Sequence, residues 1–199
     1  MRRGASMKAL KRSEVRRPPG DEPEVVRYDF GKTSIAAVAV ALSPQGVAAI
    51  AIRKDYDEEM LLGALRARFP RAILQHDTDA TRSALEAVIA FVEHPRRNLD
   101  LRLDIRGTDF QRSVWTAVLA VPFGETTTFA EVAARLGAPR AVRAVGNACS
   151  ANPLEFAIPC HRVLRRDGSW SGGSAWGDWR QSTIVGRECS AAKGKGETR

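Results

Sequence analysis

The chain has 199 residues, of which 44% are hydrophobic, and 31 basic residues against 23 acidic ones give it a formal charge of +8. This length suits one domain or two small ones, each able to bury a core. No apolar run reaches the roughly 18 residues that a membrane helix needs, so we expect a soluble protein without a secretory signal or a membrane partner. Three cysteines cannot all pair, which excludes a disulfide scaffold and favours a reducing, cytoplasmic location.

Residues 1–24 are predicted to form a basic, disordered tail or linker. The first 20 residues carry seven basic side chains and one acidic one, and they end in Pro18, Pro19 and Gly20. Such a segment is either a solvated terminus or an arm that contacts an anionic partner, and its composition leaves both open. A flexible tail is also predicted over residues 191–199.

Residues 25–106 predict a small α+β support domain with a mixed or antiparallel sheet. The turn sequence Ser43-Pro-Gln-Gly46 separates apolar, β-branched runs, so strands are expected at Val25–Phe30, Ile35–Leu42 and Val47–Ile52. Apolar residues at helical spacing predict helices at Asp55–Phe69 and Thr81–Val92. Leu99–Ile105 alternates apolar and polar residues, which is typical of a strand or extended linker with one buried face.

Residues 107–190 predict a mainly helical domain. A helix over Phe110–Leu119 places Phe110 and Trp115 on one side, with Trp115 in the core. Two shorter helices follow, joined by a turn with glycine: Thr128–Leu136, with Phe129 inward, and Pro139–Ala151, with proline in the first turn. Two short helices so joined are the layout of a helix-turn-helix.

The second of these short helices has an unusual composition. It is rich in small residues, and it also carries two arginines; the residues of interest are Ala141, Ala144, Gly146, Arg140 and Arg143. A slim helix can approach a nucleic-acid backbone closely while its arginines enter a groove. Tight packing against another helix favours the same small residues, so composition alone leaves both interpretations open.

The segment Ile158-Pro-Cys-His-Arg-Val163 is the strongest candidate for chemistry. A cysteine attacks as the thiolate, and Cys160 has His161 beside it and three arginines within six residues. In an extended segment His161 would point away from the sulfur, so a bridging water would connect them. An inert buried thiol is the competing interpretation for Cys160 and the favoured one for Cys149 and Cys189.

Other cysteine chemistries fit less well. A cysteine hydrolase could use Asn152 as the orienting residue, but the other two histidines, His76 and His94, lie in the first half of the chain, where nothing else indicates chemistry. A metal site is disfavoured because no paired cysteine or histidine spacing occurs, and a redox thiol would need a close partner. Since the thiol lies about ten residues from a candidate nucleic-acid helix, we expect it to act on nucleic acid.

From Gly107 onward the chain resembles the methylated-DNA–protein-cysteine methyltransferases, also called alkylguanine-DNA alkyltransferases. The matching motifs cover roughly 80 residues in the order and spacing of that family. They are Gly107-Thr-Asp-Phe-Gln, Val114-Trp115, Val121-Pro-Phe-Gly-Glu-Thr, Arg143-Ala-Val-Gly-Asn-Ala, Asn152-Pro153 and Pro159-Cys-His-Arg-Val. The preceding α+β domain, ribonuclease-H-like by this resemblance, is similar to the carboxy-terminal half of Ada-type proteins.

The resemblance implies a single-use DNA repair reaction by a monomer without cofactor or metal. Double-stranded DNA containing 6-O-methylguanine, and also 4-O-methylthymine, would be the partner, and the lesion would be flipped out so that Cys160 takes its alkyl group irreversibly. His161 would accept the thiol proton through water, Glu188 would orient His161, and Asn152 would support the thiolate. A cytoplasmic or nucleoid-associated location follows.

The resemblance also assigns contacts with DNA and with the flipped base. Arg143 would fill the gap left by the base, with Ala141, Ala144, Gly146, Arg140 and Phe129 on the DNA-binding surface. The base pocket would use Pro159, Val163, Trp170, Gly173 and Ser174.

Two positions depart from the family pattern. Phe129 and Gly173 stand where the family has tyrosines, and a lost hydroxyl contact is worth on the order of 1–3 kcal/mol. Tyrosine at position 129 is therefore expected to speed transfer. A degenerate sensor or regulator that recognises alkylated DNA with weak transfer is the alternative function.

Overall fold

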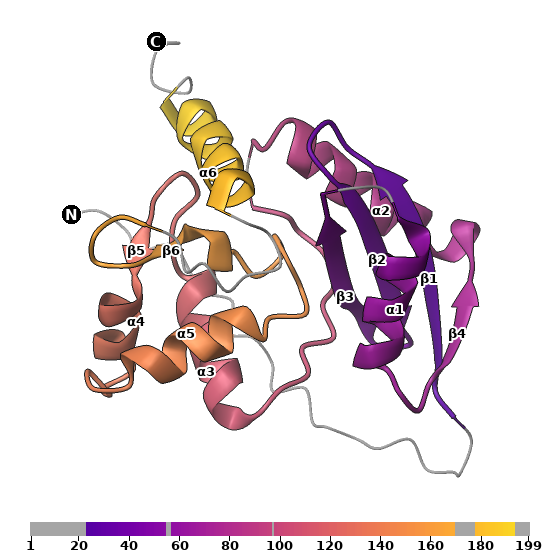
Figure 1. Ribbon diagram of the computed structural model, residues 1–199, viewed down its shortest axis with the longest axis horizontal. Helices are drawn as coiled ribbons and strands as arrows, with labels where there is room; N and C mark the ends of the chain where they lie inside the picture. Colours follow the sequence, from indigo (N-terminus) through magenta and orange to yellow (C-terminus); the bar gives the residue numbers. More distant parts are fainter. Residues whose placement is uncertain (1–22, 55–56, 97, 170–177, 194–199) are drawn as a thin grey trace, which may run out of the picture.

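The computed structural model describes residues 23–54, 57–96, 98–169 and 178–193. The first half contains β1 (Val25–Lys32), β2 (Ala37–Ser43), β3 (Gly46–Arg53), α1 (Glu58–Arg68), β4 (Ile73–His76) and α2 (Thr78–Glu93). The second half contains α3 (Asp109–Leu119), β5 (Thr127–Thr128), α4 (Phe129–Arg135), α5 (Val142–Ser150), the 3-10 helix η1 (Cys160–Arg162), β6 (Val163–Leu164) and α6 (Asp178–Lys193). A sheet-containing half beside a mainly helical half confirms the predicted α+β class (Figure 1).

The first half is built on a four-stranded sheet with the strand order β3-β2-β1-β4. β1, β2 and β3 form the predicted antiparallel meander. β4 is parallel to β1 and was not predicted, because its four residues are mostly exposed and carry no clear hydrophobic alternation. Gly46 closes the β2–β3 hairpin with φ of 143°, and a Cβ there would lie 2.4 Å from the carbonyl oxygen of Arg102.

β2 is buried on both faces of the sheet, and its alternating residues place valines on one face and alanines on the other. Val38 and Val40 face α2 and the helical half, whereas Ala37, Ala39 and Ala41 face α1. Figure 1 shows α1 on one face of the sheet and α2 on the other. The larger hydrophobic cluster continues through α3, α4, α5 and α6, so the predicted support domain and the helical domain share one core.

Residues 98–108 connect the two halves in an extended conformation. Leu99, Leu101, Leu103 and Ile105 are half-buried against the core, which confirms the alternation expected of this segment. Its backbone also pairs with the free edge of β3: Val47 N–H donates to the carbonyl of Arg102 at 2.8 Å, and Asp104 N–H donates to the carbonyl of Val47 at 2.8 Å. The connector is thus bound to the sheet.

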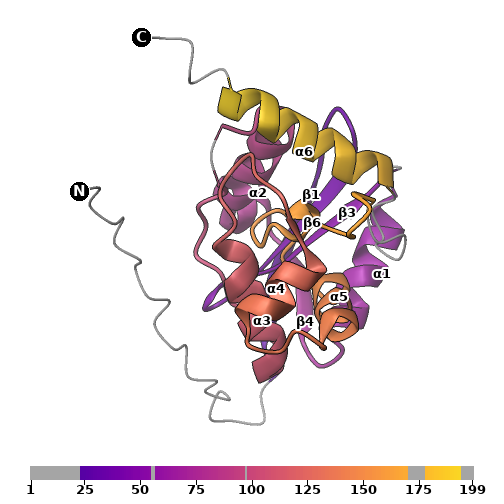
Figure 2. The same ribbon diagram turned by 90° about the vertical axis from the view of Figure 1, so that its left-hand side faces the viewer.

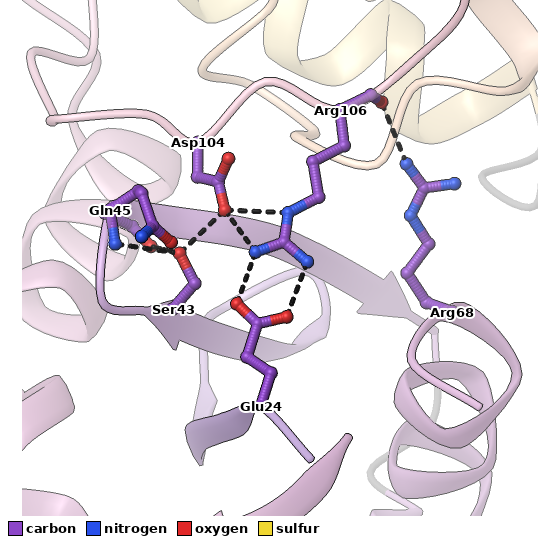
Figure 3. A network of polar contacts seen from close by, with 7 residues as sticks. Glu24, Ser43, Gln45, Arg68, Asp104 and Arg106 are labelled. Carbon is purple, nitrogen blue, oxygen red and sulfur yellow. Dashed lines mark hydrogen bonds and ion pairs between the residues drawn. The ribbon is translucent and has the colours of Figure 1, made fainter. Parts of the chain in front are cut away.

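Arg106 fastens the end of the connector to the start of the sheet (Figure 3). Its Nη1 and Nη2 donate to the two carboxylate oxygens of Glu24 at 2.7 and 2.5 Å, and its Nε donates to Asp104 at 2.7 Å. Asp104 accepts from Ser43 Oγ at 2.7 Å, and Arg68 donates to the backbone carbonyl of Arg106 at 3.2 Å. Glu24, which directly precedes β1, is therefore anchored to the fold.

Three further expectations for the helical half need correction. α5 begins at Val142 and not at Pro139, because residues 138–141 form a turn in which Ala141 N–H donates to the carbonyl of Ala138 at 2.8 Å. Residues 191–193 belong to α6 and not to a flexible tail. Phe110 lies in the first turn of α3 and is exposed, whereas Trp115 is buried as predicted. No described helix is both long and apolar enough to cross a membrane.

Candidate active site

Cys160 begins the short 3-10 helix η1, so the segment around it is not extended as expected. Pro159 caps this turn, and Arg162 N–H donates to the carbonyl of Pro159 at 3.0 Å. Val163 and Leu164 then pair in parallel with β5, directly before α4. The Cys160 side chain is partly exposed. Cys160 therefore lies on a segment joined to the start of the helix-turn-helix.

Asn152 connects the preceding turn to the thiol. Its Nδ2 donates to the carbonyl of Ile158 at 2.9 Å and lies 3.5 Å from Cys160 Sγ. Its Oδ1 accepts from Leu154 N–H at 2.9 Å, so the side chain also closes the turn that follows it. These contacts fit the predicted supporting role of Asn152.

The turn between Asn152 and Cys160 is tight and strained. Phe156 has φ of 68°, a left-handed conformation that is costly for a residue with a bulky side chain. Its ring is buried, 5.6 Å from the ring of Phe91 on α2 and 5.9 Å from the imidazole of His161. Packing on both sides therefore holds the strained residue in place.

The second cysteine of this region lies against the first. A contact with the Cys149 side chain, followed by burial, raises the pKa of the Cys160 thiol well above its ordinary value, and the charge of Glu155 adds to this rise. The hydrogen bond from Asn152 acts in the opposite direction. Cys160 is consequently a protonated thiol at neutral pH, and a base has to remove its proton before it can attack.

His161 and Glu188 form a buried pair beside the thiol. His161 Nε2 lies 3.0 Å from Glu188 Oε1, and the two side chains are 2% and 1% exposed. Burial lowers the pKa of His161, against the opposing effect of Glu188. Burial alone would raise the pKa of Glu188, but hydrogen bonds from His161 and Arg162 hold it at about 2. Because an ionised carboxylate only accepts, Nε2 carries the hydrogen and Nδ1 has the lone pair of a base.

Arg162 completes this network, and sequence reasoning noted it only as a basic neighbour of the cysteine. The side chain is 1% exposed. Its Nε donates to Glu188 Oε2 at 2.7 Å, its Nη1 donates to the carbonyl of Val121 at 3.0 Å, and its guanidinium lies 5.5 Å from the centre of the Phe123 ring. A charged residue between His161 and Val163 was the signal in the sequence for the part that Arg162 takes in a buried ion pair.

Asn98 was missed entirely. Its Oδ1 accepts from Arg162 Nη2 at 2.9 Å, although 64 residues separate the two. Asn98 lies in the connector, so the two halves of the molecule meet in the polar network of the site. No local pattern in the sequence marks such a contact.

α6 positions Glu188 by packing on the turn that follows α3. Gly124 has φ of 79°, and a Cβ there would lie 2.5 Å from Cβ of Ala192 and 3.3 Å from the carbonyl oxygen of Glu188. Cys189 Sγ donates to the carbonyl of Gly124 at 3.2 Å. The glycine therefore lets α6 approach closely enough to bring Glu188 to His161.

α5 divides its surface between packing and exposure. Val145 and Ala148 are buried, and Trp115 Nε1 donates to the carbonyl of Ala148 at 2.9 Å. The opposite side exposes Arg143 and Ala144, with Arg140 in the turn before the helix; Ala141 and Gly146 are half-buried. This side offers a slim basic surface, and its contact with DNA stays a prediction.

The remaining predicted residues divide between the core and the part of the chain that is not described. Pro159, Val163 and Phe129 are buried, so the Phe129 ring serves packing on α4 as its helical spacing predicted. Trp170, Gly173 and Ser174 lie outside the described residues. The described residues contain no group of three or more histidine, cysteine or acidic side chains that could hold a metal ion.

Comparison with known proteins shows which family the chain is similar to. Residues 109–190 match the family described as 6-O-methylguanine DNA methyltransferase, DNA binding domain. The chain is 39% identical over 169 residues to the bifunctional transcriptional activator/DNA repair enzyme Ada of Escherichia coli. The aligned region covers 85% of this chain and 47% of that protein. The chain therefore spans about half the length of the Ada proteins that it matches.

Two shorter proteins match along most of their length. The methylated-DNA–protein-cysteine methyltransferase of Methanosarcina barkeri is 37% identical, over 73% of this chain and 86% of that protein. The crystal structure of Mycobacterium tuberculosis OGT in complex with DNA superposes with a TM-score of 0.69 and 30% identity, over 83% of this chain and 94% of that one. On this agreement of sequence, fold and site, the chain belongs to the methylated-DNA–protein-cysteine methyltransferase family.

Proposed function

We propose that this chain repairs alkylated DNA by moving one alkyl group from 6-O-methylguanine, and also from 4-O-methylthymine, to its own Cys160. The observation that carries the proposal is the partly exposed residue Cys160, whose thiol is supported by Asn152 and followed by the buried His161–Glu188 pair. As the sulfur–carbon bond forms, the carbon–oxygen bond breaks and the base oxygen leaves with the bonding electrons. The thioether is stable, so each molecule acts once.

The protonation states of the site support a reaction that begins from the thiol. The raised pKa of Cys160 keeps its proton in place, and the lowered pKa of His161 keeps the imidazole neutral and able to accept it. Glu188 stabilises the imidazolium that results. His161 would take the proton of the Cys160 thiol through a water, because side chains of consecutive residues in η1 point in different directions.

The partner is double-stranded DNA, bound through the exposed side of α5. An alkyl group on a stacked base is shielded, so the base has to be flipped out to reach Cys160. Arg143, exposed on α5, would take the place of the flipped base in the stack. The small residues Ala144 and Gly146 would allow α5 to approach the groove closely. Because phosphate contacts release counterions, binding is expected to weaken as salt is raised. The protein is expected to act as a monomer in the cytoplasm or nucleoid.

The test is to incubate the protein with a duplex containing 6-O-methylguanine and then to weigh the intact chain and its peptides. We expect the mass of one added methylene on Cys160, at one lesion per molecule. Cys160→Ala should abolish the adduct and keep DNA binding.

Two outcomes would overturn the proposal. Specific binding of the methylated duplex without an adduct would indicate a sensor in place of a repair protein. More than one lesion removed per molecule would indicate a hydrolytic enzyme.

A further inference from the structure

Two consecutive residues of α6 connect different parts of the molecule. Glu188 points into the buried network with His161 and Arg162. Arg187, one residue earlier, points to the first half of the chain: its Nη2 donates to Ser34 Oγ at 3.1 Å, and its Nη1 donates to the carbonyl of Val92. Figure 2 shows α6 running past α2, to whose last turn Val92 belongs.

The acceptors of Arg187 are themselves fixed. Val92 is fully buried, and its carbonyl belongs to the negative end of the α2 dipole. Glu93 Oε2 lies 3.8 Å from Arg187 Nη1, and the other oxygen of Glu93 accepts from Ser34 N–H. The contact with Ser34, and then Arg187, lowers the pKa of Glu93, which keeps this carboxylate ionised. Arg187 is thus held at three points by α2 and the β1–β2 turn.

Adjacent residues of a helix lie about 100° apart around its axis, at a fixed rise. A helix with one side chain held in this way cannot turn about its axis without breaking those contacts. The rotation of α6 determines where the Glu188 carboxylate lies, and the Glu188 carboxylate determines the tautomer and orientation of His161. Contacts made on the first half of the chain therefore reach the proposed base.

We propose that Arg187 is a positioning residue for the transfer reaction, which it serves by fixing α6 so that Glu188 meets His161. Of the two measurements that test this inference, the transfer rate rests on the proposed function and the pKa of His161 does not. It assigns the sheet-containing half a part in the chemistry, through the end of α2 and the β1–β2 turn.

A positioning effect and a plain charge effect have opposite signs at His161. If Arg187→Gln moves Glu188 away, His161 loses the hydrogen bond that raises its pKa, and its pKa falls further. If Arg187 acted only as a distant positive charge, its removal would raise the pKa of His161. The charged neighbours of His161 within the network are Glu188 and Arg162, and Arg187 faces Glu93 at the end of α2.

The experiment measures two quantities in Arg187→Gln and Arg187→Lys. The first is the His161 pKa, by NMR titration of the protein without DNA, with the other imidazole signals assigned from His76→Gln and His94→Gln. The second is the rate of adduct formation on Cys160. We expect a lower His161 pKa in both variants, and about a tenfold slower transfer for Arg187→Gln with a smaller loss for Arg187→Lys. Lysine keeps the charge but cannot reach two acceptors with a planar fork.

The matched control is Arg82→Gln, which removes an exposed arginine of α2 that pairs with Asp79 in the same helix. It should change neither quantity. If Arg187→Gln fails to fold, Arg187→Lys and Ser34→Ala decide the question. An unchanged or raised His161 pKa together with an unchanged transfer rate would overturn the inference. Failure of the unsubstituted protein to form an adduct would refute the proposed function, and the pKa measurement would still decide the positioning role.

Discussion

Asn152 Nδ2 lies 3.5 Å from Cys160 Sγ and 2.9 Å from the carbonyl oxygen of Ile158, so one amide group supports both the thiol and the turn that carries it. The other end of the same side chain accepts from Leu154 N–H. The electrostatic contribution of Asn152 is measured by the pKa of Cys160, and its structural contribution is the support of the turn.

Asn152→Ala is expected to raise the pKa of Cys160 still further, because the donor that favours the thiolate is lost. Each added pKa unit lowers the thiolate fraction about tenfold at neutral pH. The pH dependence of Cys160 alkylation by iodoacetamide, followed by peptide mass spectrometry, measures this. Asn147→Ala, at an exposed position of α5, is the control. An unchanged pKa of Cys160 would show that Asn152 serves only the turn.

Glu188→Gln is expected to lower the free energy of unfolding by about 3–5 kcal/mol, since it leaves the buried charge of Arg162 without its partner. Urea denaturation measures the loss. Glu86→Gln, which removes an exposed carboxylate from α2, should change stability by less than about 0.5 kcal/mol. Similar values for the two variants would mean that Arg162 does not depend on Glu188.

Stability is expected to fall on acidification in two stages. The folded-state pKa of His161 lies below 6.5, so its neutral form is favoured and stability begins to fall as the pH drops through 6.5. The pKa of Glu188 is held at about 2 against an ordinary 4.5, so its contribution is complete above pH 4.5 and is lost as the pH falls toward 2.

Denaturation at a series of pH values checks this expectation. Surface carboxylates such as Glu93 and Glu131, whose pKa values are also lowered, add to the acid response. The comparison is therefore between the unsubstituted protein and Glu188→Gln. The variant should have a shallower slope between pH 4.5 and 2. Parallel slopes would contradict the assignment of that stage to Glu188.

Gly124→Ala and Gly137→Ala form a matched pair for the packing of α6. Both glycines have positive φ, 79° and 70°, but only the Cβ at position 124 meets other atoms, with Ala192 Cβ at 2.5 Å. The backbone cost of about 1–2 kcal/mol is common to both, so Gly124→Ala should lose about 1–3 kcal/mol more through overpacking. It should also slow transfer, because Glu188 moves with α6. Equal losses in urea denaturation would rule out a close-packed turn.

Gly146→Ala separates folding from DNA binding. A Cβ at position 146 meets nothing within 4 Å, and the residue lies inside α5, so alanine should stabilise the protein by up to about 1 kcal/mol. If α5 lies in a DNA groove, the added methyl group should still weaken binding to a duplex, measured by fluorescence anisotropy. Gly63→Ala in α1, which is equally open, should stabilise the protein without affecting DNA affinity. Equal DNA affinity of both variants would exclude Gly146 from the DNA surface.

The sequence was sufficient to predict elements whose hydrophobic pattern is local. The β1–β3 meander and the helices α1, α2, α3 and α4 follow from alternation or helical spacing within single segments. It failed at β4, whose four mostly exposed residues carry too little pattern, and at the start of α5, where Pro139 fits a turn as well as it fits a first helical turn.

The motif around Cys160 likewise predicted the region of the candidate site. The sequence alone contains the adjacent cysteine and histidine and their spacing to Asn152 and Glu188. Only the tertiary structure decided what surrounds it. Cys149 lies against Cys160, Asn98 accepts from Arg162 across 64 residues, and Arg187 reaches the end of α2 across 95. These contacts, and the burial that contributes to the pKa shifts of Cys160 and of His161, depend on how separate segments pack in the folded chain.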